Sequence, residues 1–127
     1  MARVLVVDDD EVSRLVIGKI LENAKHEVAY AVNGEQGIAY YKKNPSDVVV
    51  TDLVMPVKNG LQMIRELYEQ YRDVKIIAVT GVDPESLPLA EELGAVATMT
   101  KPVNPDMLLE LIDKAMHTSR GWEDVLE

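Results

Sequence analysis

Residues 47–56 read Asp47-Val48-Val49-Val50-Thr51-Asp52-Leu53-Val54-Met55-Pro56. The run of three valines between turn-forming residues is typical of a strand that is buried on both faces, as in a parallel sheet. This strand ends at Asp52, directly before a loop that contains a proline. Ligand sites in open α/β sheets lie at the carboxyl ends of the strands. The stretch therefore predicts that the Asp52 carboxylate lies where the domain does its chemistry.

The composition is that of one globular domain. The chain has 127 residues, of which 47% are hydrophobic and 28% charged, a normal balance for a single buried core. The absence of cysteine excludes disulfides, zinc–thiolate sites and a thiol nucleophile. No apolar run approaches the roughly 18 residues of a membrane span and no signal sequence is present, so we expect a cytoplasmic protein without a membrane segment. The net charge of −9 argues against direct nucleic-acid binding, which needs clustered Lys and Arg.

Short apolar runs and helical patterns alternate along the whole chain. Around the central strand we expect strands at residues 3–7, 27–32, 74–80 and 95–100, and helices at 12–23, 34–44, 60–71, 83–93 and 105–117. This alternation predicts an α/β fold: a doubly wound, five-stranded parallel sheet with helices on both faces. We assign residues 1–118 to this domain and expect residues 119–127 to be a C-terminal tail or linker remnant.

Two of the helices have features of their own. In the first, Val12, Leu15, Val16 and Ile20 recur at helical spacing after Asp10, which is a good N-cap. In the fourth, Pro88 lies inside the expected range, so this helix should begin late and be short.

Polar side chains follow four of the five strands at the point where each strand ends. They are Asp8 and Asp9, Asp52, Thr80 and Lys101. Because parallel strands end at one edge of the sheet, these side chains should converge. Clustered carboxylates repel one another, and a hard divalent cation such as Mg²⁺ removes that conflict. An acid nucleophile, a metal, a cation and a hydroxyl donor are what phosphoryl transfer to a carboxylate requires.

The motifs resemble those of the receiver domain of two-component response regulators, including the chemotaxis regulators. The matching motifs, in order, are Leu5-Val6-Val7-Asp8-Asp9, Asp52-Leu53-Val54-Met55-Pro56, Gly60, Ile76-Ile77-Ala78-Val79-Thr80 and Lys101-Pro102. The match spans about residues 3–117. The resemblance implies a flavodoxin-like sheet of strand order 2-1-3-4-5. It also implies a signalling domain that is not a conventional enzyme, although it catalyses its own phosphorylation and dephosphorylation.

The resemblance also assigns roles to residues at the acidic edge. It makes Asp52 the phospho-acceptor and Asp9 a direct Mg²⁺ ligand, with Asp8 acting through metal-bound water. The backbone carbonyl of Val54 would be a further ligand. The Lys-Pro peptide bond is commonly cis in this family, which X–Pro bonds permit at low cost.

Further roles concern the phosphoryl group and the response to it. Thr80 and Lys101 would contact the incoming phosphoryl group, and Thr80 with Thr98 would form the switch. The implied partners are a histidine kinase or phosphotransfer protein and a downstream target or output domain. The implied interaction face, also a candidate homodimer interface, consists of the fourth helix, fifth strand and fifth helix.

The chain departs from the family pattern at three positions. Thr98 stands where relatives usually have an aromatic residue that moves inward on activation. Val54 and Val82 stand where relatives often have polar groups that orient the hydrolytic water. We therefore expect a long-lived acyl phosphate, because an apolar surrounding disfavours attack by water.

Alternatives remain for the function and for the polar residues. A Mg²⁺-dependent phosphohydrolase of the haloacid dehalogenase type also uses an Asp nucleophile, but it needs a second Asp where this chain has Val54. A degenerate receiver that only binds partners is the other alternative, and the complete acceptor set argues against it. His26 and His117 have no partners at metal-ligand spacing, so we interpret both as surface residues.

Overall fold

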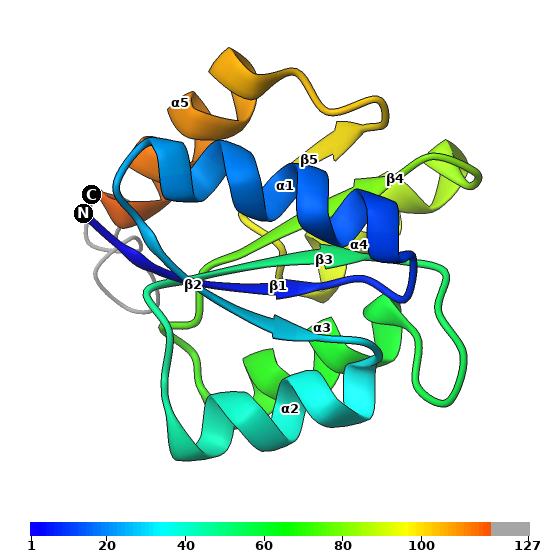
Figure 1. Cartoon of the computed structure of the whole chain (residues 1–127). Helices are drawn as coiled ribbons and strands as arrows, with labels where there is room; N and C mark the ends of the chain where they lie inside the picture. The colour runs from blue at the N-terminus through cyan, green and yellow to red at the C-terminus, as the bar shows by residue number, and fades with distance from the viewer. Residues whose placement is uncertain (118–127) are drawn as a thin grey trace.

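The computed structural model describes residues 1–117 as a three-layer α/β domain (Figure 1). Its five strands are β1 (Arg3–Val7), β2 (Glu27–Ala31), β3 (Val48–Asp52), β4 (Ile76–Thr80) and β5 (Ala97–Thr100). All neighbouring strands pair in parallel, in the order β2-β1-β3-β4-β5. This confirms the doubly wound sheet and its predicted strand order. The predicted tail, 119–127, lies outside the described residues.

In the described part of the chain, five α-helices connect and cover the strands. They are α1 (Glu11–Asn23), α2 (Gly34–Lys43), α3 (Gly60–Gln70), α4 (Leu87–Leu93) and α5 (Pro105–Met116). An Asp or Asn side chain caps the N-terminus of all but α4, by accepting a hydrogen bond from a backbone N–H in the first turn; the caps are Asp10, Asn33, Asn59 and Asn104. Helix α4 follows a short 3₁₀ turn, Pro84–Ser86 (η1), and has seven residues. The late, short fourth helix is thus confirmed.

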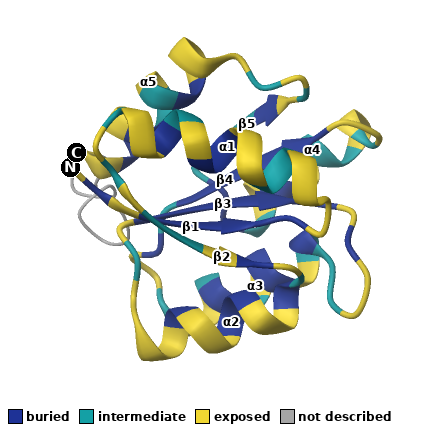
Figure 2. Ribbon diagram, in the orientation of Figure 1, coloured by how far each residue is buried: buried dark blue, intermediate teal, exposed yellow. Residues whose placement is uncertain are grey.

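The sheet separates two apolar cores, because alternate residues of each strand point to opposite faces. On one face Leu5, Val49 and Ile76 pack with the residues of α2, α3 and α4. On the other face Val6, Val50 and Ile77 pack with the residues of α1 and α5. Strands β3 and β4 are buried along their whole length, as the dark central ribbons of Figure 2 show. The residue that ends each of these strands is therefore held rigidly.

The apolar stripe read from the sequence of α1 is only in part the face that this helix buries, because Ile20 alone of that set packs against the core. Ile17 and Leu21 are buried, whereas Val12, Leu15 and Val16 are exposed, with 48–67% of their surface accessible. Both sets have helical spacing, and the packing on the sheet selects the set that contains Ile17 and Leu21. The interior set on α5 behaves as predicted: Leu108, Ile112 and Ala115 are buried and Leu111 is partly so. Within residues 1–117, no helix is long and apolar enough to cross a membrane.

Candidate functional site

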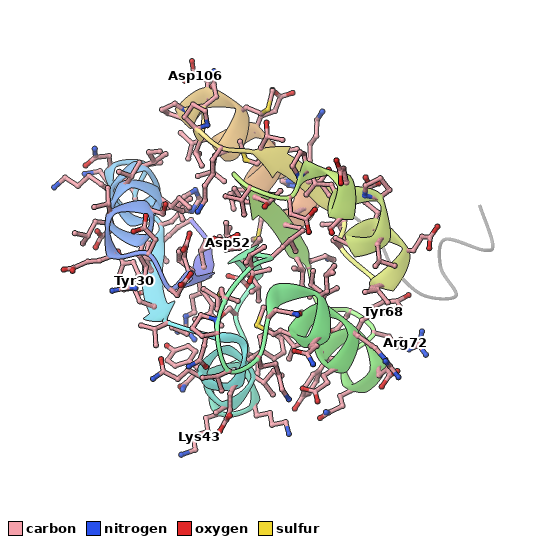
Figure 3. The ribbon with its side chains drawn as sticks, turned by 90° about the vertical axis from the view of Figure 1, so that its right-hand side faces the viewer. Tyr30, Lys43, Asp52, Tyr68, Arg72 and Asp106 are labelled. Atoms are coloured by element: carbon pink, nitrogen blue, oxygen red, sulfur yellow. The ribbon has the colours of Figure 1, made fainter. Side chains whose placement is uncertain are left out.

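Asp52 ends β3 at the middle of the sheet edge, onto which Figure 3 looks. Only 9% of the residue is exposed. Its Oδ1 accepts hydrogen bonds from the backbone N–H of Leu53 (2.7 Å) and of Val54 (3.4 Å). Its Oδ2 lies 3.1 Å from Nζ of Lys101. Both carboxylate oxygens are thus oriented before any ligand arrives.

Gly60 holds the loop that follows Asp52. Its N–H donates to the carbonyl of Leu53 at 2.9 Å. A Cβ at this position would overlap the backbone oxygen of Asp52, which cannot move aside. The close approach of the start of α3 to the end of β3 therefore requires glycine, and it fixes the backbone of the acceptor position.

The end of β1 brings two more carboxylates to the same edge. Asp8 is 1% exposed, and its Oδ1 accepts from the N–H of Asp10 at 2.9 Å. Asp9 is exposed. One carboxylate oxygen from each of Asp8, Asp9 and Asp52 lies within 4.8 Å of the other two. Three hard oxygen donors, one of them open to solvent, suit a divalent cation that keeps several water ligands.

Lys101 bridges the buried acids from the end of β5. Its Nζ lies 2.9 Å from Oδ2 of Asp8 and 3.1 Å from Oδ2 of Asp52, and its side chain is 19% exposed. Burial raises the pKa of the Asp8 carboxyl above its ordinary value, with a further contribution from the Asp52 charge, although the Lys101 hydrogen bond opposes the shift. Burial alone would lower the pKa of Lys101, but the two carboxylates outweigh it and the pKa is raised. The Lys101–Pro102 peptide bond is cis, as expected.

Thr80 and Thr98 lie on β4 and β5, which are on the opposite side of β3 from β1. Thr80 is fully buried, and its Oγ1 accepts a hydrogen bond from the N–H of Asp83 at 3.2 Å. Its backbone carbonyl accepts from the N–H of Lys101. Thr98 is partly buried on β5, in register with Ala78. The Thr80 hydroxyl is therefore tied to the loop before α4, while its backbone is tied to the strand that carries Lys101.

Aliphatic side chains are exposed in the loops at this edge. Val54 is 49% exposed, Val57 73% and Val82 78%. Val57 also has a φ of 69°, a left-handed conformation that is strained for a β-branched residue.

Two residues of α1 that the sequence analysis missed contact the site. Oγ of Ser13 lies 3.1 Å from Nζ of Lys101, and Nη1 of Arg14 donates to the backbone carbonyl of Asp8 at 2.9 Å. The side chain of Ser13 and its backbone N–H lower the pKa of the Asp10 carboxyl. The signal for both was their place in the first turn of a helix that begins directly after the acidic triplet.

The two histidines lie away from this edge and differ from each other. His117 is exposed, as predicted. His26 is only partly exposed, and its Nδ1 accepts a hydrogen bond from the N–H of Ala2 at 2.9 Å, so the surface interpretation holds only in part for His26. It has a structural partner at the start of β1.

A parallel α/β domain with an acidic, lysine-bridged cluster at the carboxyl ends of its strands belongs to the class of doubly wound domains that bind ligands at this edge of the sheet. Residues 4–113 match the family model described as "Response regulator receiver domain". The chain belongs to the response regulator receiver family and is a receiver domain of two-component signalling.

The chain is also similar, in sequence or in structure, to individual known proteins. The chain is 38% identical over 118 residues to Protein CcdB of Bacillus subtilis, covering 91% of this chain and 98% of the relative. It is 32% identical over 114 residues to Chemotaxis protein CheY of Thermotoga maritima, covering 88% and 95%. A response regulator receiver domain protein from Clostridium thermocellum has a crystal structure that superposes with a TM-score of 0.86, at 28% identity and with full coverage of both chains.

Proposed function

We propose that Asp52 accepts a phosphoryl group from a partner phosphohistidine protein in a Mg²⁺-dependent reaction, and that this modification switches a protein-interaction face. The observation that carries the proposal is the convergence at one edge: carboxylate oxygens of Asp8, Asp9 and Asp52 within 4.8 Å, with the Lys101 ammonium hydrogen-bonded to two of them. Membership of the receiver family supports the same chemistry.

The reaction is a displacement at phosphorus. A carboxylate oxygen of Asp52 forms the new P–O bond, and the P–N bond to the donor imidazole breaks, with the leaving nitrogen taking a proton from water. The carboxylates of Asp8, Asp9 and Asp52 and the carbonyl of Val54 would hold Mg²⁺. The ion supplies charge neutralisation for the phosphoryl oxygens.

Lys101 and Thr80 are the groups we expect to stabilise the transferred phosphoryl group. Lys101 already points its ammonium at Oδ2 of Asp52, so it can neutralise charge with little reorganisation. The Thr80 hydroxyl would have to turn from the N–H of Asp83 toward a phosphoryl oxygen.

That turn links the site to the interaction face. Loss of the Thr80–Asp83 contact releases the segment that leads into the short helix α4, and so biases the face formed by α4, β5 and α5. Thr98, on β5 in register with Ala78, has no aromatic ring to move inward, so we expect Thr80 to carry most of the switch. A downstream target or output domain, or a second copy of this chain, would read this face.

The donor is expected to be a histidine kinase or phosphotransfer protein. Its phosphohistidine must reach Asp52 past the loops that carry the exposed side chains of Val54, Val57 and Val82. Such a donor receives its phosphoryl group from ATP, so the proposal places the domain in the cytoplasm.

The test is phosphorylation with acetyl phosphate and MgCl₂, followed by intact mass measurement. Wild type should gain one phosphoryl group, and Asp52→Asn should gain none. The matched control is Asp47→Asn, because Asp47 precedes the same strand at its other end and accepts from the N–H of Arg3; this variant should be modified like wild type.

Other outcomes would favour the alternatives. An adduct that survives Asp52→Asn would contradict the assignment of the acceptor. No adduct on wild type would favour a degenerate receiver that only binds partners. Turnover of a phosphate ester, measured as released inorganic phosphate, would revive the phosphohydrolase.

A further inference from the structure

The ammonium group of Lys101 has three N–H donors, and three side-chain oxygens lie within hydrogen-bond distance of it. Two are carboxylate oxygens, Oδ2 of Asp8 at 2.9 Å and Oδ2 of Asp52 at 3.1 Å. The third is the neutral hydroxyl Oγ of Ser13, at 3.1 Å. The ammonium is therefore held from β1, from β3 and from α1 at the same time.

These three acceptors have different fates in the phosphorylation cycle. The two carboxylates belong to the group that would bind a divalent cation, which competes for their oxygens and repels the like charge of Lys101. Phosphorylation also removes the negative charge of the Asp52 carboxylate, since one of its oxygens becomes the bridging oxygen of an acyl phosphate. The hydroxyl of Ser13 takes part in neither event, so it remains an acceptor when both carboxylates are engaged.

We propose that Ser13 is a positioning residue for Lys101, which holds the ammonium at the site while Asp8 and Asp52 exchange it for the metal and the phosphoryl group. This inference rests on the proposed function. With one N–H kept by Ser13, the other two are free to donate to phosphoryl oxygens.

The surroundings of Ser13 make it a fixed anchor. Its own N–H is held by the capping carboxylate of Asp10 at 3.1 Å. The next residue, Arg14, is tied to the carbonyl of Asp8 at 2.9 Å. The hydroxyl is thus attached to a capped helix start that is braced against the acidic loop, an arrangement that lowers the entropy cost of holding Lys101.

The experiment compares Ser13→Ala and Ser13→Thr with Val16→Ala, all in the full chain. Val16 lines the same shallow groove between α1 and the Lys101–Val103 loop, and its side chain has no polar atom to offer Lys101. At saturating MgCl₂, Ser13→Ala should be phosphorylated by acetyl phosphate about tenfold more slowly, the worth of one hydrogen bond to a charged group. Ser13→Thr should restore the rate to within about threefold, and Val16→Ala should match wild type.

A second readout does not depend on phosphorylation. The ¹⁵N signal of the Lys101 ammonium reports whether its protons are held in hydrogen bonds. Without metal it should persist in wild type and in Ser13→Ala, because the carboxylates hold the group. After MgCl₂ is added it should persist in wild type and broaden away in Ser13→Ala, while the Mg²⁺ dissociation constants of the two proteins, from calorimetry, stay within about twofold.

The outcomes separate this inference from the proposed function. Wild type that takes up no phosphoryl group would defeat the proposed function, and the ammonium signal would still test Ser13. Phosphorylation of Ser13→Ala at the wild-type rate, or an equal loss in Val16→Ala, would overturn the role of Ser13. So would a large drop in Mg²⁺ affinity in Ser13→Ala, since that would indicate a disturbed acidic loop.

Discussion

The two edges of the sheet both carry ion pairs, but they hold them in opposite ways. At the edge where the strands begin, Arg3 and Glu27 pair at 3.2 Å with side chains 72% and 61% exposed. At the edge where the strands end, Lys101 pairs with Asp8 and Asp52, whose side chains are 1% and 10% exposed. Exposed pairs contribute little to stability, whereas buried charges are costly unless they are fully matched.

At the edge where the strands end, the positive charge does not balance the negative charge. Three clustered carboxylates face one ammonium, and the raised pKa of Asp8 reflects that burial and excess of negative charge. The beginning edge is thus a solvated surface. At the edge where the strands end, the carboxylates repel one another, and binding of a cation together with a phosphoryl group can relieve this repulsion.

The largest effect expected from this difference is stabilisation by magnesium. MgCl₂ at about one hundred times its dissociation constant should raise the free energy of unfolding by about 2.7 kcal/mol, through mass action on the folded state. Asp9→Asn should lose most of this gain, whereas Glu27→Gln, at the opposite edge, should keep it. Urea denaturation with and without MgCl₂ measures it, with NaCl at matched ionic strength as the control for screening. An equal gain in NaCl would remove the argument for a specific site.

Removal of one acid should also stabilise the metal-free protein. Asp52→Asn should raise the free energy of unfolding by about 1 kcal/mol, because a buried like charge disappears while the amide oxygen can still accept from the N–H of Leu53. Glu27→Gln should change stability by less than about 0.5 kcal/mol, since it alters an exposed pair. Urea titrations in EDTA measure both. A less stable Asn variant would mean that the Lys101 contact outweighs the repulsion.

The lifetime of the phosphoryl group tests the loops at the carboxyl edge. The exposed side chains of Val54 and Val82 have no group that can orient water, so we expect slow hydrolysis. Val54→Asn should shorten the lifetime about tenfold by supplying such a group. The matched control is Val32→Asn, because Val32 follows β2, the strand that brings no side chain to the site, and is also exposed. The measurement follows the loss of the phosphoryl group from the phosphorylated protein. Loss from wild type within seconds would contradict the expectation of slow hydrolysis.

The sequence was sufficient for the sheet and for most of the acidic edge. Four of the five strand-length apolar runs ended in a polar residue of the site, and parallel pairing then required Asp8, Asp52 and Lys101 to meet. It was not sufficient for the buried face of α1, because two apolar stripes both satisfy the helical period and only the packing of Ile17 and Leu21 selects between them.

Contacts that depend on side-chain direction were also beyond the sequence. Ser13 and Lys101 are 88 residues apart, and no local pattern links them. The bond between Thr80 and the N–H of Asp83 depends on how the β4–α4 loop folds back. The partner of His26 is the backbone N–H of Ala2, just before β1. Every residue except proline has such a group, so no sequence pattern could identify it.

Backbone strain offers a finer comparison of the edges. Val57, in the β3–α3 loop, has φ 69°, and Lys25, between α1 and β2 at the opposite edge, has φ 71°. Val57→Gly should raise the free energy of unfolding by about 0.5–1 kcal/mol, since relief of left-handed strain in a β-branched residue exceeds the entropy cost of glycine. Lys25→Gly should gain less, because Lys is not β-branched. Urea denaturation of both variants gives the difference, and an equal gain would show that branching is unimportant here.

The smallest effect concerns pH at the edge where the strands begin. Burial, with the positive N-terminus, lowers the pKa of His26 below its ordinary 6.5, and its neutral Nδ1 accepts from Ala2. Because the unfolded chain binds the proton more tightly, this contribution is full above about pH 6.5 and is lost as the pH falls toward the lower folded-state pKa. His26→Gln should flatten the pH dependence of unfolding between pH 7 and 5 by less than about 1 kcal/mol. His117→Gln, which alters an exposed ring, is the control, and an equal flattening there would assign the slope to general surface charge.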